Sequence, residues 1–272
     1  MTLTGPGDYP PPHHMLRDLR IEFEHADESR VWMPAQRHLA DARGHVRLGA
    51  LATMVDVIGG GLAALAAAPG WIATADLSVH ALNPVIADDR TTLVANARVL
   101  RAGRTTVVIE CSIESEPAGG AVALATMTFS VLERRASNPV LTTPQIGGRS
   151  ERQTMASNGS TLRRPLLDAL GVQRPGPGVG ELHLTPYVVN SLGSVQGGAL
   201  ATLAEYAAET LDEAGASATV DLQLAYLALA KGGPIRATAS FAGAGDVVRV
   251  EIIDAGHALR TTTVALARLG RR

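Results

Sequence analysis

The chain has 272 residues and a formal net charge of −2, so it lacks the excess of positive charge that is typical of nucleic-acid binding. Apolar residues make up 46% and charged residues 18%, which are ordinary values for a globular protein. The length allows one or two domains, and a single cysteine excludes both an intramolecular disulfide and a metal site built from several cysteines.

The first half of the chain predicts one long helix between strands. Residues 1–14 form a tail without a signal-peptide pattern, which favours a cytoplasmic location. Residues 48–68 are long enough to span a membrane, but Asp56 lies near their middle, where an Asp costs about 2.5–3.5 kcal/mol. We therefore expect a buried helix and no membrane segment. Strands are predicted at 29–33, 73–82, 92–113 and 121–132.

The second half repeats this order after a linker. Residues 136–160 are rich in Ser, Thr, Asn, Gly and Pro and have no apolar period, so they predict a linker. A strand at 180–184 and a helix at 198–215 follow. Further strands are predicted at 218–227, 233–254 and 258–269. The predicted organisation is a first unit at 1–135, the linker at 136–160 and a second unit at 161–272.

The two halves carry the same phrase, GALAT, followed three residues later by an acid. Placing Gly49 on Gly198 sets Asp56 on Glu205, and ATADLSVHAL on ATVDLQLAYL further along the chain. Each copy has one apolar helix followed by consecutive strands rather than alternating strands and helices. The prediction is an α+β fold made twice, in which an antiparallel sheet wraps a central helix.

The segment NSLGSVQGGALATLAE at 190–205 carries a family resemblance. It resembles the N-x-x-G-x-x-H-G-G pattern, followed by a helical Asp or Glu, of the phenylacetate-pathway (PaaI-type) and 4-hydroxybenzoyl-CoA-type acyl-CoA thioesterases. The T-x-D-L strand starts and the RAGR turn are similar to that family as well. The resemblance implies a double hotdog fold, an acyl-CoA substrate, active sites between the units, and neither a cofactor nor a metal.

The resemblance also implies roles for residues of the second copy. The N–H groups of Gly197 and Gly198 would bind the thioester oxygen, because a helix N-terminus favours developing negative charge. Glu205 would be the base or the nucleophile, and Asn190 would orient it. Gln196 stands where the family usually has His, and Gln cannot be protonated near pH 7. The alternatives are glycines that only allow close packing and a Glu on a solvent face.

The first copy departs further from the family pattern. Asp41 stands in place of Asn, Arg47 in place of His, and Leu48 in place of the first Gly. Only Gly49 and Asp56 fit. The sequence therefore favours Glu205 as the working acid, and leaves Asp56 either as a second catalytic acid or as a relic paired with an Arg.

Substrate-binding candidates come from the first copy. Arg101 and Arg104 in RAGR have no basic counterpart in the second copy, which reads AGAG, so they are candidates for the phosphates of CoA. A solvated turn is the alternative. His80 and Asn83 follow the helix and could line a site or be ordinary strand and turn residues.

Three functions compete. An acyl-CoA thioesterase is the leading prediction, and a non-catalytic acyl-CoA-binding or regulatory protein is the alternative, because Gln196 replaces His. A hydratase or dehydratase ranks last, because no His follows Asp56 or Glu205 at short spacing. A homodimer of double-hotdog chains is plausible.

Overall fold

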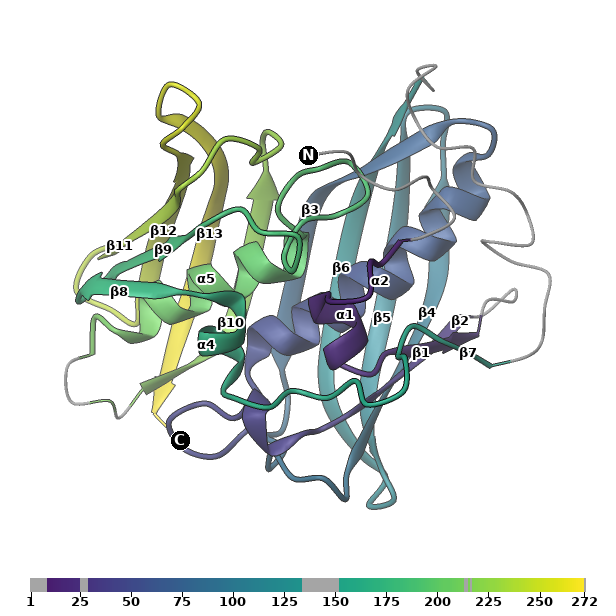
Figure 1. Cartoon of the computed structure of the whole chain (residues 1–272), viewed down its shortest axis with the longest axis horizontal. Coiled ribbons are helices and arrows are strands. Elements are labelled where there is room, and N and C mark those ends of the chain that lie inside the picture. Colours follow the sequence, from purple (N-terminus) through teal and green to yellow (C-terminus); the bar gives the residue numbers. More distant parts are fainter. Residues whose placement is uncertain (1–8, 25–28, 134–151, 213–214, 216, 272) are drawn as a thin grey trace.

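Thirteen strands form one antiparallel sheet in the computed structural model, which describes residues 9–24, 29–133, 152–212, 215 and 217–271 (Figure 1). The strand order is β7-β1-β2-β4-β5-β6-β3-β10-β13-β12-β11-β9-β8. Two long helices, α2 and α5, lie on the same face of this sheet.

The first unit contributes the strands from β1 to β6 around α2. Its α1 is a single turn that lies beside α2 in Figure 1. The elements are α1 (Met15–Asp18), β1 (Glu22–Glu24), β2 (Ser29–Pro34), the 3-10 turn η2 (Arg37–Leu39), α2 (Leu48–Ala67), β3 (Trp71–Ala81), β4 (Thr92–Ala102), β5 (Thr106–Glu116) and β6 (Gly120–Leu132).

The second unit repeats this arrangement around the shorter α5. After β7 (Gln153–Thr154) in the linker, its elements are α4 (Leu166–Leu170), β8 (Gln173–Gly176), β9 (Val179–Leu182), α5 (Gly197–Glu209), β10 (Ser217–Tyr226), β11 (Ile235–Phe241), β12 (Val247–Asp254) and β13 (Arg260–Arg271). The predicted strands and both predicted helices are therefore present, and the α+β double hotdog is confirmed.

The units join through their edge strands. β3 pairs with β10 in antiparallel register, with Leu77 opposite Leu224 and Val79 opposite Leu222. These four side chains are fully or almost fully buried, so the join continues the apolar core from one unit to the other.

The predicted tail and linker are partly built into the fold. Of the tail, residues 9–14 are described, and the buried His14 ring lies 2.9 Å from the Val189 carbonyl oxygen of the second unit. Of the linker, residues 152–160 are described, and they include β7, which pairs with β1. Two-residue pairings of this kind leave no periodic pattern in a sequence. Residues 136–151 lie outside the described residues.

The helix α2 is the one described helix that is long and apolar enough to cross a membrane, and 67% of its most apolar window is buried inside the protein. Its apolar side chains pack on the sheet of the first unit and on α5. The predicted buried helix is thus confirmed. Burial on nearly all sides explains why this helix lacks the polar face of a surface helix.

Candidate active site

The two helices cross at their repeated glycines. A Cβ atom on Gly198 would lie 2.0 Å from Thr53 Oγ1, and one on Gly49 would lie 2.6 Å from Thr202 Oγ1. Only glycine permits this approach. The crossing explains the repeat GALAT, in which the Gly of each helix packs on the Thr of the other. It also delivers the acid of each helix to the N-terminus of the opposite helix, which creates two equivalent positions.

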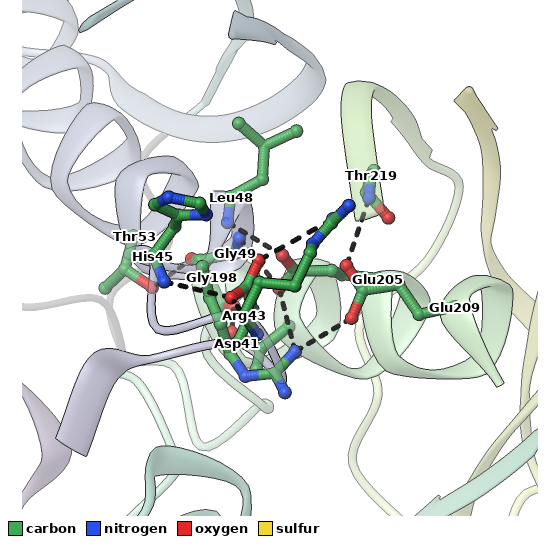
Figure 2. Close-up of polar contacts among 12 residues, drawn as sticks. Asp41, Arg43, His45, Leu48, Gly49, Thr53, Gly198, Glu205, Glu209 and Thr219 are labelled. Atoms are coloured by element: carbon green, nitrogen blue, oxygen red, sulfur yellow. Dashed lines mark hydrogen bonds and ion pairs between the residues drawn. The ribbon is translucent and has the colours of Figure 1, made fainter. Parts of the chain in front are cut away.

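At the first position, called the closed site, Glu205 faces the N-terminus of α2 (Figure 2). Its carboxylate accepts hydrogen bonds from the N–H groups of Leu48, at 2.7 Å, and Gly49, at 3.1 Å. Arg47 Nη1 donates to Glu209 Oε2 at 3.0 Å and lies 3.9 Å from Glu205 Oε2. The remaining cavity measures about 20 Å³. The N–H groups that would bind a thioester oxygen are therefore occupied by the protein's own carboxylate.

The closed site is a buried charge cluster. Glu205 is 1% exposed. Burial and the neighbouring Glu209 carboxylate raise the pKa of Glu205, although Arg47 and the two N–H donors act in the opposite direction. Glu209 also accepts from the N–H of Thr219 at 3.0 Å. These contacts connect α5, β10 and the start of α2, and they describe a structural junction between the units.

At the second position, called the open site, Asp56 faces the N-terminus of α5. Thr74 Oγ1 donates to Asp56 Oδ1 at 2.9 Å, and Gln196 Nε2 lies 3.5 Å from Asp56 Oδ2. A Cβ atom on Gly197 would lie 2.8 Å from Asp56 Oδ2, so glycine lets the carboxyl group approach the helix start. Tyr226 donates from its hydroxyl to the Gly197 carbonyl oxygen at 3.1 Å.

The open site borders a cavity of about 500 Å³. Residues of α2, β3 and β6 line it from the first unit, and the segments 190–192, 194–197 and 226–229 line it from the second. Burial raises the pKa of Asp56 to about 6, against the lowering effect of the Thr74 hydroxyl. The side chain of Gln196, which directly precedes α5, makes no capping hydrogen bond. In the described part of the chain, Asp56 contacts Thr74 and Gln196 and not the first N–H groups of α5, which can therefore bind a ligand.

Two of the substitutions noted in the sequence distinguish the sites. α5 is preceded by Gln196 and begins with Gly197, whereas α2 is preceded by Arg47 and begins with Leu48. Leu48 lines the small closed cavity, and Arg47 supplies the positive charge that a buried pair of carboxyl groups needs. The departures of the first copy from the family pattern therefore belong to the closed site.

Asn190 lines the cavity of the open site, as Asp56 does. Its Oδ1 accepts hydrogen bonds from the N–H groups of Leu192, at 2.9 Å, and Ser194, at 3.1 Å. It thus holds the loop that leads into α5 and lines the cavity. The sequence analysis assigned it to Glu205; the structure brings it together with Asp56, Gln196 and Gly197 instead.

His80 and Asn83 lie outside the open cavity. His80 Nδ1 is 3.0 Å from Asp221 Oδ1, an exposed contact between β3 and β10. Asn83 Nδ2 donates to the Ala121 carbonyl oxygen at 2.7 Å, and Asn83 lines the closed site. Both side chains connect neighbouring strands or turns, which is the simpler of the two roles that the sequence left open.

Arg101 lies at the end of β4 and Arg104 lies in the turn between β4 and β5, and both are exposed. They do not line the open cavity, but the turn is close to its wall. Thr106 lies opposite Ser130, which lines the cavity, and the Thr105 carbonyl oxygen accepts from the N–H of Val131 at 2.8 Å. Arg104 therefore lies in a turn beside β6, and Arg101 lies on β4, which β5 separates from β6.

Two residues of the open site were missed by the sequence analysis. Thr74 belongs to the repeated ATADL and ATVDL strand starts, so comparison of the copies could have found it. Tyr226 gave no signal, because the equivalent position of the first copy is not a tyrosine. Its contact depends on how the second unit folds on itself.

Comparison with known proteins agrees with this architecture. Residues 8–128 match the family model described as the acyl-CoA thioesterase C-terminal domain. No curated protein sequence matches the chain. An acyl-ACP thioesterase from Bacteroides thetaiotaomicron is 13% identical, with a TM-score of 0.59 over 90% of this chain and 98% of that chain. A 12:0-ACP thioesterase from Umbellularia californica is 11% identical, with a TM-score of 0.58 over 91% and 99%.

A structure described as a putative oleoyl thioesterase from Lactobacillus plantarum has a TM-score of 0.59 at 10% identity and covers 91% of this chain and 97% of that one. At such identities the likeness concerns the fold, and it extends over both units and their arrangement. The chain thus has the double-hotdog fold, and its residues 8–128 are similar to the acyl-CoA thioesterase C-terminal domain.

Proposed function

We propose that the protein hydrolyses an acyl-CoA thioester in the open site, with Asp56 as the base or nucleophile. One observation carries this assignment: the partly buried Asp56 carboxyl group faces the N-terminus of α5 beside a cavity of about 500 Å³ and accepts a hydrogen bond from Thr74, not from the helix N–H groups. Glu205, which the sequence favoured, has the same relation to α2, but it occupies the N–H groups itself. We therefore assign Glu205 a structural role and Asp56 the chemical one.

In the proposed reaction the thioester oxygen accepts hydrogen bonds from the first N–H groups of α5. Negative charge develops on this oxygen as water attacks the carbonyl carbon, and the helix dipole stabilises it. Asp56 accepts the proton from water. The C–S bond then breaks, and the leaving thiolate takes this proton from Asp56. Direct attack by Asp56 is the covalent variant, in which water hydrolyses the resulting anhydride.

The surroundings of Asp56 suit a general base. Its pKa of about 6 leaves most of the carboxyl groups ionised at pH 7 while keeping them more basic than an exposed Asp. Gln196 can donate from its amide to Asp56 Oδ2 or to the substrate, and so orient either without carrying a proton.

The assignment is tested by release of free thiol from acyl-CoAs. Asp56→Asn should lower kcat by about 10²–10⁴-fold, the usual contribution of an acid–base group. Glu205→Gln should leave kcat per folded molecule within a few-fold, with the folded fraction measured by circular dichroism. Asp221→Asn, which removes a carboxylate from the outer contact with His80, is the matched control.

The opposite pattern, with Glu205→Gln inactive and Asp56→Asn active, would return the chemistry to the closed site. Tight binding of acyl-CoA without thiol release would favour the non-catalytic protein instead. Acyl-ACP should be tested beside acyl-CoA, because two of the structural relatives are described as ACP thioesterases.

We further propose that Arg101 and Arg104 contact the phosphates of the carrier. Their support is positional: both are exposed, and their turn adjoins the strand that lines the cavity. Arg101→Ala and Arg104→Ala should raise KM several-fold with kcat unchanged, because these contacts are equal in ground and transition states. Arg249→Ala, which removes an exposed side chain on β12 of the second unit, is the control. An unchanged KM would exclude both residues.

The cytoplasmic location and the homodimer of double-hotdog chains stay predictions. Fractionation of cells tests the location. The molar mass of the purified chain, measured by light scattering, tests the dimer.

A further inference from the structure

The open cavity follows α2 away from Asp56. Val57, Gly60 and Ala64 line it along the same helix, at spacings that place them on one face. At Gly60, a Cβ atom would have no other heavy atom within 4 Å. Packing therefore does not require glycine at this position, although Gly lowers helix stability relative to Ala. It leaves open space in the wall of the cavity.

The equivalent position in the other copy shows what a side chain does there. Gly60 lies four residues after Asp56, and Glu209 lies four residues after Glu205. Glu209 contacts Arg47 and Thr219 and helps to fill the closed site, whose cavity is about 20 Å³ against about 500 Å³ in the open site. At this helix position the filled, closed site therefore has a Glu side chain, whereas the accessible, open site has no side chain.

The walls of the open cavity differ in chemistry on the two sides of Asp56. Toward the C-terminal end of α2 they are mostly apolar, formed by residues of α2, β3 and β6, with Thr74 and Ser130 as the polar members. The apolar side chains include Val57, Ala64, Trp71, Ile72, Ala73, Phe129 and Leu132. Toward the second unit they include the polar residues Asn190, Ser191 and Ser194. We call the first part the apolar arm and the second the polar arm.

We propose that the acyl group of the substrate lies in the apolar arm and passes over Gly60 and Ala64 toward Trp71, so that Gly60 determines acyl-chain length. This inference rests on the proposed function and specifies its substrate as an aliphatic acyl thioester of medium length. From Asp56 to Ala64 the helix advances about 12 Å. With C–C bonds of about 1.5 Å in a zigzag, that distance holds on the order of ten carbons. The amide-bearing arm of the carrier then lies in the polar arm.

The test compares straight-chain acyl-CoAs from about two to about sixteen carbons, a range that includes chains shorter and longer than the roughly ten carbons that this arm holds. The wild-type protein should prefer chains near ten carbons. Gly60→Leu should lower kcat/KM at least 50-fold for these chains and leave acetyl- and butyryl-CoA within about three-fold. Gly60→Ala should shift the preference toward shorter chains and raise the melting temperature. Ala66→Leu, on the exposed face of α2, should change neither.

A Gly60→Leu loss that is equal at all chain lengths would overturn the inference, because it would place the carrier rather than the acyl chain beside Gly60. So would full retention of activity on long chains. Binding of non-hydrolysable S-alkyl-CoA thioethers of the same lengths separates this inference from the proposed function. Length-dependent binding that Gly60→Leu abolishes, without any thioester turnover, would support the acyl subsite and contradict the hydrolase.

Discussion

At the scale of single residues, Asp56 and Glu205 occupy equivalent helix positions in opposite surroundings. Glu205 is one methylene longer, reaches two N–H groups of α2 and lies beside Arg47. Asp56 receives one hydroxyl donor, from Thr74, and keeps a raised pKa of about 6. The difference follows from the longer side chain of Glu205 and from the neighbouring side chains, and it gives two carboxyl groups different tasks.

The Thr74 hydroxyl gives the first prediction at this scale. If the ionised form of Asp56 is required, kcat/KM should rise with pH to a plateau, with a midpoint near the pKa of about 6. Thr74→Val removes a donor that lowers this pKa, so the midpoint should move to higher pH, whereas Thr74→Ser should keep it. Full pH profiles of the three proteins measure this effect. A midpoint that is identical in all three would argue against Asp56 as the titrating group.

At the scale of elements, the crossing of α2 and α5 positions both sites at once. The Gly and Thr of GALAT make the contact, so the residues that look most like a catalytic motif in the sequence are partly packing residues. Gly198 belongs to this contact through its α-carbon, while Gly197 lies against Asp56. Of these adjacent glycines, Gly198 thus allows the two helices to pack closely, and Gly197 allows Asp56 to approach the start of α5.

Substitution of the packing glycine should destabilise the fold. A Cβ on Gly198 would lie 2.0 Å from Thr53 Oγ1 and 2.6 Å from Thr53 Cα, and the backbone atom cannot rotate away. Gly198→Ala should therefore lower the free energy of unfolding by about 1–3 kcal/mol, the usual cost of overpacking. Gly60→Ala, also within a helix, should raise it. Urea unfolding of both variants provides the measurement, and equal effects of the two would contradict the crossing.

At the scale of the whole molecule, the duplication supplies the two halves of the open site, which is the proposed active site. The open site takes its carboxyl group from the first unit and its helix N-terminus from the second. In the closed site the second unit supplies the carboxyl group and the first unit supplies the helix N-terminus, and these contacts hold the two units together. A tandem chain allows this difference to develop, because its two copies can change independently while the partner unit stays at a high effective concentration.

Cleavage between the units tests how much they depend on the covalent link. A protease site placed within residues 136–151 should allow cutting without separation, because β3–β10 pairing and the helix crossing remain. The two fragments should elute together from a sizing column and keep the thioesterase activity of the uncut protein. Separate elution, or activity lost on cutting, would show that the linker itself maintains the site.

The sequence predicted the elements well, because each helix has its own apolar period and each strand its own alternation. GALAT revealed the duplication, and the Gly-Gly helix start of the second copy revealed half of the open site. The sequence could not show which of the two acids faces which helix N-terminus. Asp56 and Gln196 are 140 residues apart, and they meet through a crossing of two helices that no local pattern records.

The strand order has a consequence for association between molecules. The long strands β3 and β10 pair with one another, so the sheet ends instead at β7, with two residues, and β8, with four. Short outermost strands offer few free backbone groups to an incoming chain, which protects a wide sheet against polymerisation by strand addition. A second copy would therefore associate through a sheet face rather than by extending the sheet.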